Sequence, residues 1–445
     1  MKLIETIKNI WKIEDLRKRL ATTFLFILIY RFGCHVVLPG INPADLEAMR
    51  NFTSGGLMAL LDMFSGGAFG QASIFALGIM PYITASIVIQ LMGMVVPSFQ
   101  KMQREGESGR MKLNQYTRYL TVAILIVQAP AYLMNLQYQV RAAGGQANIS
   151  LWMMIFLTIV LTAGAMMIMW LGEKMTDKGI GNGISIIILV GILARFPGAI
   201  IQEFTNRLNT AQGGLVMFLV EIVILFAVTA GAVMLTQGTR KVPVQYAKRI
   251  VGNKQYGGAR QYIPLKVNAA NVMPIIFAQA LMFIPITLAG FGQNQDASGV
   301  SGWIARNFGD MNGVWYNVIY FIMIVLFTYF YTAITVRPTQ MAEEMKKNSG
   351  FIPGVKPGKK TAEYLDSIMS RITLPGSIFL GIVAILPAFA RFFGVNQQFA
   401  QFFGGTSLLI TVGVVLDTLQ QIETHLMMHH YDGLMKSGKI KGRNR

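Results

Sequence analysis

The sequence predicts an all-α protein that crosses a membrane ten times. Of its 445 residues, 53% are hydrophobic and 13% are charged, whereas an ordinary soluble domain carries about 25% charged residues. Apolar segments close to the roughly 20 residues needed to cross a bilayer recur along the chain. Lys and Arg gather in alternate connections between these segments, which is typical of a polytopic membrane protein.

The chain is predicted to begin with a basic amphipathic helix over 1–19, which lies along the membrane surface. We divide the rest into a first half over 20–200, a second half over 214–423 and a basic cytosolic tail over 424–445. A shorter apolar stretch, 57–69, precedes the second span and is too short to cross the bilayer. The ten predicted spans are centred on 20–38, 75–96, 117–136, 151–171, 183–200, 214–236, 270–290, 314–336, 372–390 and 405–423.

The basic residues predict the orientation of these spans. With the N-terminus in the cytosol, the inner segments hold 32 of the 39 Lys and Arg residues, including all 20 lysines. Both termini are therefore predicted to be cytoplasmic. The inner segments are 1–19, 97–118, 172–182, 237–269, 337–371 and 424–445. The other seven basic residues are Arg31, Arg50, Arg141, Arg195, Arg207, Arg306 and Arg391.

Two inner connections, 237–269 and 337–371, are longer than the topology requires. Both are rich in Lys and Arg, and both contain glycine or proline turn signals. Long basic excursions are typical of docking surfaces, so we expect both to bind partners; positive-inside charge alone is the alternative. The turn signals are Gly257-Gly258, Pro353-Gly354 and Pro357-Gly358.

The second and seventh spans share a Met-Pro pair, in GIMPYI (78–83) and NVMPII (271–276). Because the two spans are five apart, an odd offset, the pair predicts two inverted five-helix halves. Inverted repeats also occur in secondary transporters, which is the alternative function. The ionisable residues inside spans that such a transporter could use are Glu221 and Asp417, and neither lies beside the Met-Pro pairs in the sequence.

No sequence feature indicates catalysis. The single cysteine, Cys34, excludes an internal disulfide framework and a cysteine-based metal site. We find no nucleophile–base spacing, phosphate-binding loop or metal motif. We therefore expect no enzyme activity, no metal and no cofactor.

Seven sequence blocks, in order, resemble the SecY family, the channel subunits of the bacterial Sec protein translocase. The resemblance implies a clamshell around a central hourglass pore in the inner membrane. Unfolded preproteins would cross through this pore, and membrane proteins would leave it sideways between the second and seventh spans. The blocks are SGGAFGQASIFALGIMPYITASIVIQL (65–91), EGESGRMKLNQYTRY (105–119), GEKMTDKGIGNGISIII (172–188), VPVQYAKR (242–249), PLKVNAANVMPIIFA (264–278), GFIPGVKPGKKT (350–361) and FGGTSLLITVGVVLDT (403–418).

Isoleucines match the constriction of the family's pore. Two pairs among them are spaced i, i+4, so each pair faces one way on its helix. Bulky apolar side chains at a narrow waist exclude water and ions without selecting a peptide sequence. The six ring residues are Ile79, Ile83, Ile184, Ile188, Ile276 and Ile410.

The stretch 57–69 matches the family's plug, a short helix that closes the pore. A static packing helix is the alternative. The apolar plug residues are Leu57, Leu60, Leu61, Met63 and Phe64.

Polar residues match the family's lateral gate, although static packing between helices is an equal alternative. These gate residues are Thr84, Ser86, Gln90, Gln128 and Gln279.

The two long inner connections match the docking sites of the ribosome and of SecA, the motor ATPase. Lys356 stands where the family usually has Arg; it keeps the charge and loses the planar hydrogen-bonding fork. The resemblance also implies SecE, SecG or an equivalent, signal-peptide-bearing preproteins and membrane lipid as partners. The docking residues are Arg240, Lys241, Lys248, Arg249, Lys254 and Arg260, and then Lys346, Lys347, Lys356, Lys359 and Lys360.

Overall fold

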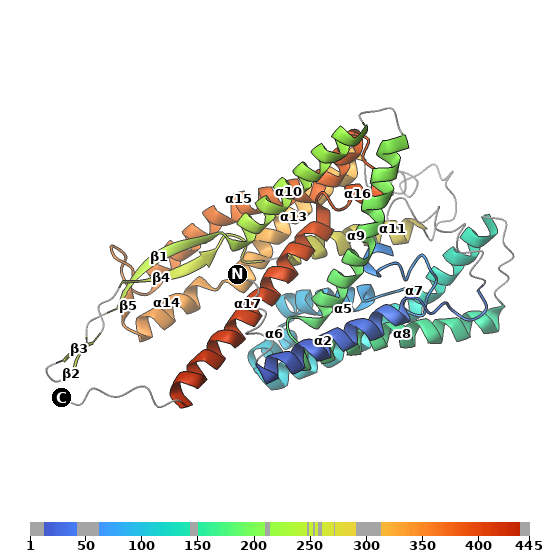
Figure 1. Cartoon of the computed structure of the whole chain (residues 1–445). Coiled ribbons are helices and arrows are strands. Elements are labelled where there is room, and N and C mark those ends of the chain that lie inside the picture. The colour runs from blue at the N-terminus through green and yellow to red at the C-terminus, as the bar shows by residue number, and fades with distance from the viewer. Residues whose placement is uncertain are drawn as a thin grey trace. The chain divides into compact units, whose positions relative to one another are not determined.

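Within the described residues the chain is mostly helical, and each of the ten predicted spans contains a helix (Figure 1). Seven described helices are long and apolar enough to cross a membrane, or eight if a bent pair, Met80–Gly93 with Pro97–Gln103, counts as one span. The computed structural model describes residues 13–41, 62–142, 150–209, 214–246, 249–251, 254–256, 260–270, 272–290 and 313–436.

The chain forms two compact units. Unit 1 contains Met1–Ile201 and Val414–Arg445, and unit 2 contains Gln202–Gly413. The helices of unit 1 are α2 (Glu14–Gly33), α5 (Met80–Val95), α6 (Pro97–Arg104), α7 (Glu107–Ala142), α8 (Leu151–Lys178), most of α9 (Gly183–Asn209) and most of α17 (Gly405–Lys436).

The core of unit 1 lies between α7, α8 and the segment over residues 62–79. Leu133 of α7 and Leu161 of α8 are completely buried there, together with Ala72 of the segment. A Cβ atom at Gly164 would lie 2.3 Å from the carbonyl oxygen of Ile74. Glycine is therefore what allows α8 to approach the backbone of the segment so closely.

Two prolines shape the second span. Pro81 lies in the first turn of α5, where its missing N–H costs no helical hydrogen bond. Val96 is extended (φ −99°, ψ 118°) because it precedes Pro97, the first residue of α6. The axes of α5 and α6 consequently differ by 102°.

The first span differs from its predicted bounds of 20–38. Helix α2 starts at Glu14 and ends at Gly33, and the chain then becomes extended. The N–H of Leu38 donates to the carbonyl of Ala72, and the N–H of Ile74 donates to the carbonyl of Val36, both at 2.9 Å. Residues 1–12 of the predicted amphipathic helix lie outside the described residues.

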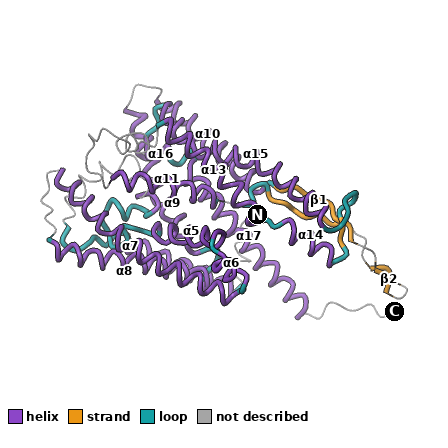
Figure 2. The backbone as a smooth tube through the Cα atoms, turned by 180° about the vertical axis from the view of Figure 1, so that it is seen from behind, coloured by secondary structure: helices purple, strands orange, loops and turns teal. Residues whose placement is uncertain are grey.

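Unit 2 combines helices with a small sheet (Figure 2). Its helices are α10 (Gly214–Gln237), α11 (Met273–Gly290), α13 (Val314–Thr335), α14 (Pro338–Lys347), α15 (Lys359–Phe392) and α16 (Gln397–Ala400). Its strands are β1 (Thr239–Tyr246), β2 (Arg249–Val251), β3 (Lys254–Tyr256), β4 (Arg260–Lys266) and β5 (Gly350–Phe351).

The two long inner connections are folded. β1 pairs antiparallel with β4, and its far edge pairs with β5 from the second connection. Val242 and Val244, two residues apart on β1, point into a core that includes Ile352 and Leu365. We call β1, β4, β5, α14 and the first turns of α15 the sheet module. A search for long apolar segments misses these elements because each buries only a few apolar residues.

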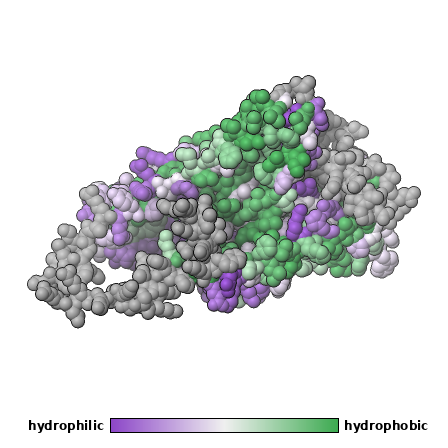
Figure 3. Space-filling model, in the orientation of Figure 1, coloured by the Kyte–Doolittle hydropathy of each residue, from purple (hydrophilic) through white to green (hydrophobic). Residues whose placement is uncertain are grey.

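The surface separates by polarity in the way a membrane protein requires. Apolar side chains cover the helices, and hydrophilic side chains gather around β1 and α14 (Figure 3). On α10 the large exposed apolar residues are Leu215, Val216, Leu219, Val220, Val223, Ile224, Phe226 and Met234.

A charged cluster is buried in unit 2, at the end of α9. The Arg207 guanidinium donates from Nε to Glu203 Oε1 at 2.9 Å and from Nη2 to Glu221 Oε1 at 2.5 Å. The other oxygen of Glu203 accepts the backbone N–H of Asn396 at 2.9 Å. The cluster therefore ties α9, α10 and the turn before α16 together, and Arg207 is the partner that Glu221 needs inside its apolar helix.

Arg207→Ala should destabilise the protein by about 3–5 kcal/mol, because it leaves two carboxylates buried without a cation. Lys18→Ala is the matched control: Lys18 and Glu14 are also an i, i+4 ion pair, with side chains 71% and 70% exposed. Thermal unfolding in detergent should show a large loss for Arg207→Ala and no measurable loss for Lys18→Ala. Equal losses would show that the buried cluster is not a stabilising element.

Candidate functional site

The 62–79 segment is buried yet mostly non-helical. It has one helical turn at 62–64 and turns up to the start of α5. Three of its glycines, Gly66, Gly67 and Gly78, have φ angles of 67°, 92° and 56°. These left-handed angles are accessible to glycine at little cost, so the glycines permit the chain to reverse within a small space.

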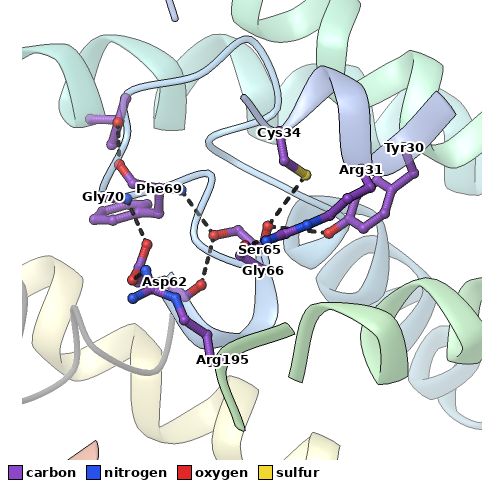
Figure 4. A network of polar contacts seen from close by, with 10 residues as sticks. Tyr30, Arg31, Cys34, Asp62, Ser65, Gly66, Phe69, Gly70 and Arg195 are labelled. Atoms are coloured by element: carbon purple, nitrogen blue, oxygen red, sulfur yellow. Dashed lines mark hydrogen bonds and ion pairs between the residues drawn. The ribbon is translucent and has the colours of Figure 1, made fainter. Parts of the chain in front are cut away.

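Side chains of α2 hold the middle of the segment (Figure 4). The Tyr30 hydroxyl donates to the carbonyl of Ser65 at 3.2 Å, and Arg31 Nη1 donates to the carbonyl of Gly66 at 2.6 Å. Cys34 Sγ lies 3.7 Å from the same Ser65 oxygen. These groups satisfy backbone carbonyls that have no partner in a regular element.

The start of the segment is held by charge. One Asp62 carboxylate oxygen accepts the N–H of Gly70 at 2.7 Å, and the other forms an ion pair with Arg195 of α9. A Cβ atom at Gly191, one turn before Arg195, would lie 2.8 Å from the carbonyl oxygen of Phe64. Helix α9 therefore contacts the segment through a small residue, Gly191, and a cation, Arg195.

Sequence reasoning missed the role of these residues. Arg31 and Arg195 are predicted only as outer basic residues, although each is an arginine near or within an apolar span. A cation in such a place needs a partner, which is the signal that could have led to Asp62. The partner of Arg195 is 133 positions away (195 − 62 = 133), so no local pattern identifies it.

The predicted plug falls partly within this segment. Met63 and Phe64 are buried. Leu57, Leu60 and Leu61 lie outside the described residues.

The ring residues lie at the ends and middles of four helices. Ile79 is buried immediately before α5, Ile188 is buried in α9, and Ile410 is buried in α17. Ile83, Ile184 and Ile276 are partly exposed. Ile276 and Ile410 belong to unit 2 and the other four to unit 1; their convergence into one ring stays a prediction.

The gate residues on α5 bond locally. Thr84 Oγ1 donates to the carbonyl of Met80 at 3.1 Å, and Gln90 Nε2 donates to Ser86 Oγ at 3.2 Å. Gln128 is partly exposed on α7, and Gln279 is buried on α11 in unit 2. Their shared role in a gate stays a prediction.

The sheet module contains Arg240, Lys241, Arg260, Lys346, Lys347, Lys359 and Lys360, from two connections that are far apart in the sequence. Arg249 and Lys254 belong to β2 and β3, which form a separate two-stranded sheet. Gly354 and Gly358, with φ of 85° and 101°, bracket a turn in which Lys356 is exposed. Thr361 Oγ1 donates to the carbonyl of Lys356 at 3.0 Å and fixes that turn against the start of α15. The exposed docking residues are Arg240, Lys241, Lys346, Lys347, Lys356, Lys359 and Lys360. Lys248 lies outside the described residues, as do the side chains of Arg249, Lys254 and Arg260.

Among the described residues, no three or more His, Cys, Asp or Glu side chains are grouped to hold a metal ion. The predicted site residues carry apolar side chains, amides and surface cations.

Comparisons with known proteins identify the family. The family model that matches is SecY, over residues 73–419. A curated relative from Streptomyces griseus, "Protein translocase subunit SecY", is 44% identical over 437 residues, covering 96% of this chain and 98% of the relative. A relative of the same name from Mycobacterium bovis is 41% identical over 442 residues, covering 95% and 97%. The chain belongs to the SecY family.

Solved structures agree on the fold. The chain resembles a SecY structure described by its plug domain, with a TM-score of 0.62, 19% identity and 92% coverage of both chains. It also resembles a protein-conducting channel, with a TM-score of 0.59, 18% identity and 92% coverage of both chains. The predicted fold, that of the SecY clamshell with a plug, is confirmed, as is the function of a multi-pass protein-translocation channel. The comparisons give the transporter alternative no support.

Proposed function

We propose that this SecY-family chain forms the pore through which unfolded preproteins cross the bacterial inner membrane and from which membrane proteins enter the lipid sideways. The observation that carries the proposal is the family match, which runs from residue 73 to 419 and so includes residues of both units. The chain does no catalysis and needs no cofactor. Energy for translocation comes from a partner or from a membrane gradient, because the sequence contains no phosphate-binding loop.

The orientation in this proposal is set by charge. All 20 lysines fall in segments assigned to the cytosol, including those of the sheet module. Anionic lipid and the membrane potential both favour this side for basic residues. We therefore place both termini and the sheet module in the cytosol.

The sheet module is the proposed docking surface for the motor SecA and for the ribosome. SecE, and SecG or an equivalent, are the proposed partners within the membrane. Two solved neighbours are ribosome complexes: a canine Sec61 channel, with a TM-score of 0.55 and 18% identity, and a yeast Ssh1 complex, with a TM-score of 0.60 and 12% identity. Exposed Lys and Arg on a folded platform would bind the phosphates of ribosomal RNA.

Within the membrane, the ring residues and the gate residues have different roles. The six isoleucines form the seal, since apolar side chains at a waist repel water and ions around a passing chain. Thr84, Ser86, Gln90, Gln128 and Gln279 form the polar side of the gate. Two short bonds within α5, from Thr84 to the carbonyl of Met80 and from Gln90 to Ser86, satisfy polar groups of this helix locally, which makes polar side chains tolerable in an apolar span.

Thiol labelling in sealed cells tests the orientation. Gly145→Cys and Val300→Cys should react with an impermeant reagent from outside, and Gln255→Cys and Val355→Cys only after the cytosolic side is opened. The native Cys34 is buried, so it should contribute little background. Labelling of position 255 from outside would overturn the orientation.

Ile410→Asn and Ile276→Asn should each raise the resting ion conductance of the purified channel in planar bilayers, because a buried amide recruits water where isoleucine repels it. Ile410→Leu is the control and should stay sealed, since it conserves apolar volume. If neither Asn variant leaks, these residues are not part of the seal.

Lys356→Glu should slow SecA-driven export severalfold by reversing the charge at the exposed turn, whereas Lys356→Arg should be tolerated. Pulse-labelling should show a larger defect for secreted proteins than for co-translationally inserted membrane proteins, which depend on the ribosome. An unaffected Lys356→Glu variant would remove this residue from the docking surface, and equal defects in both classes would indicate a folding fault in the module.

A further inference from the structure

The Asp62–Arg195 ion pair lies where the predicted plug meets α9 (Figure 4). Asp62 is 6% exposed, and its two oxygens have different tasks. One caps the turn through the N–H of Gly70 at 2.7 Å, and the other meets the Arg195 guanidinium. Removing the Arg195 charge would leave the buried Asp62 carboxylate without its cation.

The guanidinium also covers the turn that follows. A Cβ atom at Gly67 would lie 3.1 Å from Arg195 Nη2 and 3.2 Å from Nε. Phe64, between Asp62 and this turn, has its carbonyl against Gly191 of α9. Helix α9 therefore contacts residues 62–67 in two ways: through the charged side chain of Arg195, and through the close approach of its backbone at Gly191 to the carbonyl of Phe64.

The next residues are held in a different way. Ser65 and Gly66 are bound through their carbonyl oxygens by Tyr30 and Arg31 of α2, while Asp62 is bound through its charge by α9. Gly66 and Gly67, both in left-handed conformations, follow Ser65 directly. The glycines make this the point where the chain can change direction at the lowest conformational cost.

We propose that the Asp62–Arg195 ion pair is a latch that determines how much free energy a signal peptide must supply to displace the plug. Breaking it removes the charge contact between Asp62 and α9, while α2 still holds the carbonyls of Ser65 and Gly66. Arg195 is thus a specificity-determining residue of the channel, because a weak latch admits weaker signals. The latch rests on the proposed plug role of residues 57–69, and its test separates the two.

The measured quantity is the export of a reporter with a defective signal peptide, divided by the export of the same reporter with an intact one. This ratio does not depend on how much folded channel each variant supplies. The variants are made in the full chain in its native membrane with its partners. Asp62→Asn keeps an oxygen for the N–H of Gly70 and removes the charge, so it isolates the ion pair. Arg195→Gln removes the other charge, and Arg391→Gln is the control at an outer arginine outside this network.

Each latch variant should raise the ratio about tenfold, the effect of losing one charge-assisted hydrogen bond. The double variant should raise it no further than either single, since both remove one interaction. Arg195→Lys should raise it less, because it keeps the charge. Additive effects of the two single variants, or ratios equal to that of Arg391→Gln, would overturn the latch.

Deletion of residues 57–61 distinguishes the latch from the plug. If the deletion raises the ratio and Arg195→Gln then adds nothing, both proposals stand. If the deletion raises the ratio and Arg195→Gln has no effect in the intact chain, or has the same effect with and without the deletion, the plug stands and the latch fails. If the deletion leaves the ratio unchanged, the plug role fails, and the latch fails with it.

Discussion

A backbone carbonyl buried away from water must find a partner inside the protein, and the 62–79 segment concentrates this demand in unit 1. Helices satisfy themselves, but this segment has only one helical turn at 62–64 and is nonetheless buried. Its partners are supplied by side chains around it: the hydroxyl of Tyr30, the guanidinium of Arg31 and the hydroxyl of Tyr132, which donates to the carbonyl of Phe69 at 2.8 Å. These hydrogen bonds link α2 and α7 to the segment.

Unit 2 has a buried charged cluster of its own. Arg207 stands between two carboxylates, and one of these reaches the backbone of Asn396. A cation in hydrocarbon is costly, and it is retained where several fixed acceptors surround it. In both units an arginine of α9 pairs with a buried carboxylate, Arg195 with Asp62 in unit 1 and Arg207 with Glu203 and Glu221 in unit 2.

The sequence was sufficient to predict the helices, but it was insufficient to predict which polar groups would bond to one another. Long apolar segments predict spans because the bilayer thickness sets their length, and the six isoleucines predicted as the ring lie in blocks that resemble a family. The sheet module was not predicted as a sheet, because the β1–β5 pairing joins Gln245 to Phe351 across a separation that no local pattern reports. The ends of helices were displaced for a related reason: α15 starts at Lys359 and not near 372, since its polar first turns are held by the sheet module and not by lipid.

The bend at Val96 has a mechanical consequence for α5. Beyond the bend, Phe99 of α6 packs on Tyr116 of α7, with ring centroids 5.7 Å apart, so this end of α5 is fixed against sliding along its own axis. A helix fixed at one end moves by pivoting, and its displacement grows with distance from the pivot. The 16 residues of α5 make a lever of about 24 Å, so a tilt of about 10° would carry its far end about 4 Å. The far end of α5 is Met80, next to Ile79. A small rotation of α5 about the bend therefore displaces its Met80 end the most, where the apolar side chains of the second span begin.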